Sequence, residues 1–126
     1  MKNPWIMIAA LIGGAAVILG AVGAHIVRGN GGEIRYHDLA VTYQMFHVAA
    51  LIAVAVVVPA AGKLAHLAGG IFVLGMLLFC GSLYALAWTG QPLGYNVTPT
   101  GGMLLIGGWF LLAIAGWQYN QKQIKN

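Results

Sequence analysis

Charged residues are scarce in this chain. Of its 126 residues only 6% are charged, six Lys or Arg and two Asp or Glu, whereas 60% are hydrophobic. Soluble domains carry roughly 25% charged residues, so this composition excludes an ordinary water-soluble domain. The two acidic residues, Glu33 and Asp38, are expected near a membrane interface rather than in an apolar pocket, so no catalytic acid–base pair is evident. We therefore expect no enzyme activity.

Cysteine is almost absent as well. The single Cys80 lies inside a hydrophobic run and is expected to be a small packing residue. No paired His or Cys spacing matches a metal-ligand motif, so His25 and His47 are only weak metal candidates, with His37 or Met45 as further ligands. We expect no metal and no other cofactor. The basic residues form no dense cluster, so the net charge of +4 indicates contact with anionic lipid headgroups rather than nucleic acid.

Long hydrophobic runs fill most of the chain. Four of them are evident, at about residues 5–27, 39–58, 65–88 and 101–119. Each approaches or exceeds the ~20 residues with which a helix crosses a bilayer, and lipid offers no partner to a free backbone amide. The sequence predicts a single all-α domain over residues 1–126, with four transmembrane helices in an up-down-up-down bundle.

The basic residues predict an orientation. Four spans put both termini on one side, together with four lysines: Lys2, Lys63, Lys122 and Lys125. Arg28 and Arg35 lie on the other side. Because cytoplasmic loops are enriched in Lys and Arg, we expect both termini to be cytoplasmic. Aromatic residues near the helix ends fit interfacial belts: Trp5, Trp117 and Tyr119 on the inner side, and Tyr36, Trp88 and Tyr95 on the outer side.

The loops predict where the second helix begins and ends. Asn30, with Glu33 three residues later, could cap a helix that continues outward from the second span through Arg35 and Asp38. Pro59 and Gly62 are expected to stop that span. The short connection at residues 60–64 makes the second and third helices antiparallel neighbours.

Glycine is abundant, with 19 residues. In a membrane the hydrophobic effect does not drive helices together, and small residues instead let their backbones approach closely enough to pack. The predicted packing positions are the pairs Gly20 with Ala24 and Gly81 with Ala85, and the seven-residue series Gly101, Gly108 and Ala115. The sequence leaves open whether one of these stripes faces a second copy of the chain.

The polar residues inside the spans are the candidate site. They fall in the same half of the bilayer: His25, Tyr43, Gln44, His47, Ser82, Tyr84 and Thr98. Four interpretations remain: a hydrogen-bond network that fixes packing, a site for a lipid headgroup or small polar ligand, a proton or ion path, and a metal site. In the other half only His66 is available, so a continuous conducting path is poorly supported.

Five short strings carry a resemblance to a known family. They are Gly-Ala-Val-Gly-Ala-His at 20–25, Tyr-Gln-Met-Phe-His at 43–47, Gly-Ser-Leu-Tyr at 81–84, Thr-Pro-Thr-Gly-Gly at 98–102 and Gly-Trp at 108–109. In order and spacing they resemble the YgdD/YwdK-like family of small four-helix membrane proteins of unknown function, which includes the eukaryotic transmembrane protein two-fifty-six. The resemblance implies a bacterial inner-membrane or organellar setting and no catalytic residue. It draws attention to His25, Tyr43, His47, Ser82, Tyr84 and Pro99.

Our leading hypothesis is a non-enzymatic protein of the bacterial inner membrane, with membrane lipids as partners. It would be a homo-oligomer or an accessory subunit of a larger membrane complex. The alternatives are a lipid or small-ligand binder, or a small transporter or channel, that uses the polar cluster.

Overall fold

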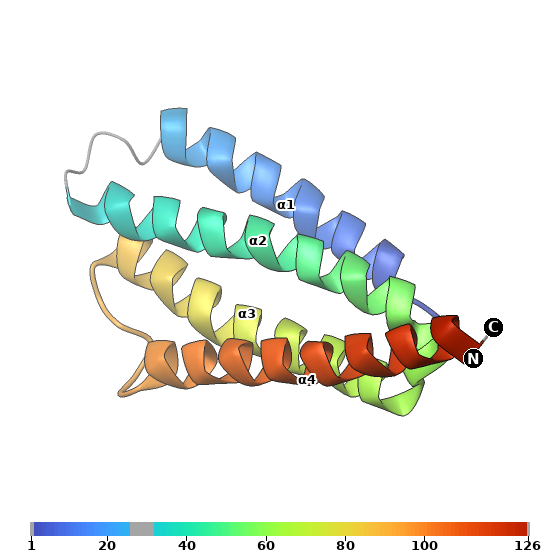
Figure 1. The fold of residues 1–126 in the computed structure, drawn as a ribbon. Helices are drawn as coiled ribbons and strands as arrows, with labels where there is room; N and C mark the ends of the chain where they lie inside the picture. Colours follow the sequence, from blue (N-terminus) through green and yellow to red (C-terminus); the bar gives the residue numbers. More distant parts are fainter. Residues whose placement is uncertain (1, 26–31, 126) are drawn as a thin grey trace.

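The protein is an all-helical bundle in the computed structural model, which describes residues 2–25 and 32–125. Its four helices are α1 (Trp5–His25), α2 (Gly32–Ala61), α3 (Lys63–Thr89) and α4 (Val97–Lys125), and the described residues contain no strand. All four are long and apolar enough to cross a membrane. The helices run up, down, up and down, so that α1 begins and α4 ends at the same end of the bundle (Figure 1). The predicted fold class is confirmed.

The bundle has a terminal end and a loop end. The terminal end holds the start of α1, the turn from α2 to α3 and the end of α4 (Figure 1). The loop end holds the end of α1, the start of α2 and the connection from α3 to α4. As predicted, α2 continues outward through Arg35 and Asp38, and it starts at Gly32. The predicted cap Asn30 lies outside the described residues.

Pro59 does not end the second helix, contrary to the sequence prediction. The helix α2 contains Pro59 and runs to Ala61, and only Gly62, at φ 53°, separates it from α3. A proline has no N–H to donate to the carbonyl four residues earlier, which is Ala55. The side-chain amide of Asn3 donates to that Ala55 oxygen at 3.0 Å instead. The start of the chain thus supplies the hydrogen bond that the proline removes.

The helix α1 has one main neighbour, whereas each of the other three helices has two or more. The helix α3 packs along both α2 and α4, and α4 also contacts α2, whereas α1 packs mainly along α2 (Figure 1). The main core lies where α2, α3 and α4 meet, and Leu51, Val54 and Phe72 are fully buried there. Away from Trp5, which contacts α3 at the start of α1, a side groove lies between α1 and α3.

The close helix contacts lie at some of the predicted glycines and not at others. A Cβ atom at Gly101 would meet the backbone of Phe79 on α3, and one at Gly108 would lie 2.8 Å from the ring of Phe72. A Cβ at Gly20 would lie 3.8 Å from Val41, which is an ordinary contact. At Gly81 no heavy atom of the described residues would lie within 4 Å.

The pairs Gly20 with Ala24 and Gly81 with Ala85 make no close helix contact among the described residues. The side chain of Ala24 is exposed, Ala85 is half-buried, and Gly81 lines the groove between α1 and α3 instead of a helix contact. The tightest seam is that of α4 against α3, because small residues recur on the face of α4 that meets α3.

Candidate functional site

Three tryptophan–histidine hydrogen bonds tie the helices together. The indole N–H of Trp88 donates to Nδ1 of His37, that of Trp109 to Nε2 of His47, and that of Trp5 to Nδ1 of His66, each at 3.0 Å. These bonds use three of the four tryptophans and three of the four histidines in the chain. Each one joins residues that are more than 50 positions apart. They are the main polar cross-links of the bundle.

The indole bonds fix the protonation of the rings. An indole nitrogen is a donor only, so the imidazole nitrogen that it contacts carries a lone pair and the proton sits on the other nitrogen. His37 then donates from Nε2 to the carbonyl of Leu19 at 2.6 Å, and His47 donates from Nδ1 to the carbonyl of Tyr43 at 2.7 Å. Both rings are neutral and use both nitrogens within the protein.

His37 connects three helices. It lies on α2 with 0% of its surface exposed, and it bonds to α1 through Leu19 and to α3 through Trp88. The ring of Tyr84 meets it edge-on, with centroids 5.2 Å apart. The absence of a side chain at Gly23 makes this possible, because a Cβ there would lie 2.5 Å from the imidazole. Gly23 and His37 form one packing unit that holds α1 on α2.

His66 has an unpaired nitrogen. Trp5 occupies its Nδ1, so the proton must sit on Nε2, and that buried atom has no hydrogen-bond partner within the described part of the chain. Trp5 itself is buried, with its ring against Gly69. The sequence assigned Trp5 to an interfacial belt, and the structure adds that its ring packs between α1 and α3 at the terminal end of the bundle.

The predicted polar cluster divides into separate groups. Gln44 accepts from the hydroxyl of Tyr84 at 2.7 Å and donates to the carbonyl of Ile12 at 2.9 Å. The hydroxyls of Ser82 and Thr98 share a hydrogen bond of 2.5 Å. These contacts link α1, α2 and α3 in the first group, and α3 and α4 in the second.

Tyr43, His47 and His25 lie outside those two groups. The ring of Tyr43 stacks on His47, with centroids 6.2 Å apart, in a hollow of about 410 Å³ that α4 also lines. His25 is exposed at the end of α1, and no hydrogen bond joins it to another residue in the described ranges. The sequence places His25, Tyr43 and His47 in the same half of the bilayer, and the structure brings only Tyr43 and His47 into contact. Tyr43 and Gln44 are neighbours on α2 and both contact α3, but Gln44 also bonds to α1 through Ile12, whereas Tyr43 lines the hollow beside α4.

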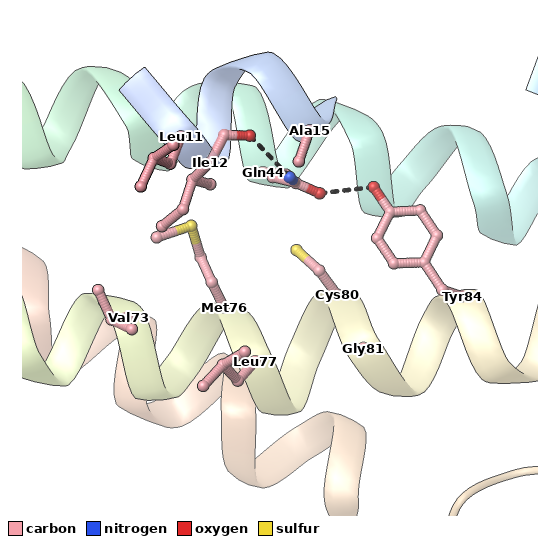
Figure 2. Close-up of a pocket in the computed structure, with 10 residues that line it drawn as sticks. All are labelled: Leu11, Ile12, Ala15, Gln44, Val73, Met76, Leu77, Cys80, Gly81 and Tyr84. Atoms are coloured by element: carbon pink, nitrogen blue, oxygen red, sulfur yellow. Dashed lines mark hydrogen bonds between the residues drawn. The ribbon is translucent and has the colours of Figure 1, made fainter. Parts of the chain in front are cut away.

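The groove between α1 and α3 is a mainly apolar cavity. It has a volume of about 310 Å³, and its walls are aliphatic residues of α1 and α3 together with Cys80 and Gly81. The Gln44–Tyr84 pair is its polar part, as Figure 2 shows with the two dashed bonds of Gln44. Leu11 and Leu77, which also line it, are 68% and 66% exposed. The groove therefore opens sideways, onto the surface that lipid covers in a membrane.

A metal centre is not formed by the described residues. Among them, no group of three or more His, Cys, Asp or Glu side chains could hold an ion. The two weak candidates, His25 and His47, do not contact each other, and the lone pair of His47 already accepts from Trp109. The arrangement supports hydrogen bonding and packing rather than ligation.

Sequence reasoning missed the three tryptophan partners. It placed Trp5 and Trp88 at the interface because they lie near helix ends, and it used Trp109 only as part of a family string. A pattern within one helix cannot show that an indole faces an imidazole on another helix. The only available signal was the equal number of tryptophans and histidines in a chain with few polar side chains.

Comparison with known proteins gives consistent matches over most of the chain. A family model described as "Protein of unknown function (DUF423)" matches residues 19–102. A UPF0382 membrane protein of Haemophilus influenzae is 38% identical over 122 residues, covering 94% of this chain and 97% of that protein. The UPF0382 inner membrane protein YgdD of Escherichia coli is 32% identical over 124 residues, covering 96% and 95%. No solved structure matches.

Proposed function

Because this chain belongs to the DUF423 family, whose relatives are membrane proteins, we propose that it is a non-catalytic membrane protein that binds an amphipathic molecule of the bilayer in the groove between α1 and α3. The resemblance noted in the sequence is confirmed, and the chain is an integral membrane protein. By analogy with the Escherichia coli relative, the proposed location is the bacterial inner membrane.

Saturated hydrogen bonding supports the non-catalytic part of this proposal. A general base needs a free lone pair within reach of a substrate. In both His37 and His47, one ring nitrogen accepts a hydrogen bond from an indole and the other donates to a backbone carbonyl. Glu33 and Asp38 belong to the first turns of α2, at the loop end, and no hydrogen bond joins Asp38 to His37 or His47 among the described residues. The hydrogen bonds of the two histidines thus support a structural role for them.

The Gln44–Tyr84 pair carries the binding part of the proposal. Gln44 lies 12 residues along the 30-residue α2, or about 18 Å from its start at 1.5 Å per residue, so it is well inside the membrane. Polar groups at such depth are costly unless they are bonded or used by a ligand. The amide of Gln44 has a second N–H, and the oxygen of Tyr84 can still accept.

These groups indicate the chemistry of the ligand. A hydroxyl or carbonyl group could bond to the Gln44–Tyr84 pair, while a hydrocarbon chain lies along the aliphatic walls (Figure 2). The volume of about 310 Å³ is at the lower end of the ~300–1,000 Å³ typical of ligand pockets. One narrow amphiphile fits better than a bulky headgroup.

A plug in the groove tests the binding. In Gly81→Leu the new side chain enters open space inside the groove and should displace the ligand without disturbing a helix contact. Gly70→Leu is the matched control, because Gly70 lies on the same helix, also faces open space and does not line the groove. The measurement is native mass spectrometry of protein purified in mild detergent, with extraction and identification of copurifying amphiphiles.

We expect wild type and Gly70→Leu to retain a bound amphiphile that Gly81→Leu loses. Tyr84→Phe should weaken the retention and keep the groove. If wild type, Gly70→Leu and Gly81→Leu carry the same bound molecules, or if wild type carries none, the groove is not a binding site. The same spectra measure assembly, which stays a prediction: a homo-oligomer would appear at a multiple of 13.2 kDa.

The orientation is also a proposal, supported by the four lysines at the terminal end. The test uses two variants in a Cys80→Ser background, one with a single cysteine at position 91 and one with a single cysteine at position 123. Gln91 and Gln123 are exposed, lie at opposite ends of the bundle and are uncharged, so neither substitution alters the lysines on which the prediction rests. An impermeant maleimide should label position 91 in intact cells and position 123 only after permeabilisation. The reverse pattern would place the termini outside.

A further inference from the structure

The terminal end of the bundle is positively charged and lacks acidic side chains. Its four exposed lysines are Lys2, Lys63, Lys122 and Lys125. The only two acidic side chains of the chain, Glu33 and Asp38, belong to the first turns of α2 at the other end. A group of lysines with no Asp or Glu side chain among the described residues around it attracts anions, and most strongly where the surface is hollowed.

Two adjoining hollows lie at this end and share two residues. One, of about 480 Å³, lies between the start of the chain, the turn from α2 to α3 and α4, and its polar side chains are Asn3 and Lys122. The other, of about 320 Å³, is lined by Trp117, Gln118, Gln121, Lys122 and Lys125. Lys122 and Ala60 line both, so Lys122 stands between the two hollows.

The start of α3 adds to the positive field. Gly62, which lines the larger hollow, is the N-cap of α3 and provides no side chain to bond to the free amides of the first turn. The unpaired N–H groups at a helix start carry partial positive charge and favour an anion nearby. The hollow thus combines a lysine, an amide side chain and a positive helix end.

From these features we propose that the paired hollows around Lys122 bind the phosphate of an anionic phospholipid headgroup. The site lies at the ends of the helices, which is where lipid phosphates lie when the helices span the bilayer. Trp117, 62% exposed on the rim, presents an indole of the kind that anchors proteins at the headgroup level. Lysine is a suitable ligand because it binds phosphate as a point charge.

Charge placement within the terminal end gives a sharp test. Lys122→Gln removes the charge that both hollows share, and Lys125→Gln removes a charge from the smaller one. Lys63→Gln is the matched control, because it removes the same charge at the same end and does not line either hollow. All three side chains are exposed, so circular dichroism and thermal unfolding should be unchanged.

The measurement is native mass spectrometry of the detergent-solubilised protein titrated with phosphatidylglycerol, with phosphatidylcholine as the zwitterionic comparison. We expect phosphatidylglycerol to bind more tightly. Lys122→Gln should lower that affinity about fivefold, which corresponds to the contribution of one lysine near an anionic lipid surface. The double variant Lys122→Gln/Lys125→Gln should lose more, and Lys63→Gln should lose little.

Three outcomes would overturn the site. Equal affinity for the two lipids would show that the phosphate charge is not recognised, and an equal loss in Lys63→Gln would show diffuse charge attraction instead of these hollows. Displacement of phosphatidylglycerol by an equal concentration of inorganic phosphate would assign the site to a free anion. Gly81→Leu, which plugs the separate groove between α1 and α3, should leave phosphatidylglycerol affinity unchanged, so this test and that of the proposed function fail independently.

Discussion

A single methyl group added at Gly101 should destabilise the protein far more than the same group added at Gly107. The Cβ of an alanine at 101 would meet the backbone nitrogen of Phe79 and lie 2.8 Å from its Cα and 2.9 Å from the carbonyl carbon of Leu78. These are main-chain atoms of α3, which cannot move aside as a flexible side chain can. The two helices must therefore separate along the seam.

The expected loss for Gly101→Ala is about 1–3 kcal/mol, the usual range for overpacking, and larger for Gly101→Leu. Gly107→Ala is the matched control, since it lies on the same helix and its Cβ would have no heavy atom of the described residues within 4 Å. Both changes gain helix propensity over glycine, about 0.8–1 kcal/mol, so the difference between them isolates the contact. Gly108→Ala should fall between them, because it meets only the ring of Phe72.

Thermal unfolding in detergent, followed by circular dichroism, measures these differences. Equal melting temperatures for Gly101→Ala and Gly107→Ala would show that α3 and α4 are not held at the distance seen here. A loss at Gly107 greater than that at Gly101 would instead indicate that the lipid-facing side of α4 packs against another chain.

Hydrophobicity and length were sufficient to predict the four spans. Lipid offers no hydrogen-bond partner, so the backbone N–H and C=O groups of each span must bond to one another within a helix. Their ends were less predictable. The helix α2 passes through Pro59 because Asn3, 52 residues away from Ala55, supplies the missing hydrogen bond. A local rule about proline has no access to such a partner.

Small-residue spacing identified the seam at Gly101 and Gly108, and it equally selected Gly81, which faces an open groove. The spacing shows that a helix has a smooth face, and not which neighbour meets that face. Likewise the polar residues of the site were found by their cost in a membrane, whereas their grouping depended on the direction in which each side chain leaves α2. Gly23, which makes room for His37, had no signal of its own beyond being a glycine.

Replacing His37 by alanine should be among the most damaging changes at any polar residue. The ring is fully buried and joins α2 to α1 and α3. Its removal leaves a cavity beside Gly23 and an indole N–H of Trp88 without its acceptor. We expect a loss of about 2–4 kcal/mol in the free energy of unfolding, from the cavity and the unpaired donor together.

Two partial replacements separate the contributions of the two nitrogens. An asparagine oxygen at position 37 can accept from Trp88 as Nδ1 does, while a glutamine amide can donate toward Leu19 as Nε2 does, so each should recover part of the loss. Trp88→Phe removes the donor. Combined with His37→Ala, it should cost less than the sum of the single changes, by about 0.5–1.5 kcal/mol, because no unpaired N–H remains. His25→Ala, at the exposed end of α1, is the control and should have the same melting temperature as the wild type. Strict additivity of His37→Ala and Trp88→Phe would mean that the indole and the imidazole are not bonded, and that the neutral, fully used state assigned here to His37 is wrong.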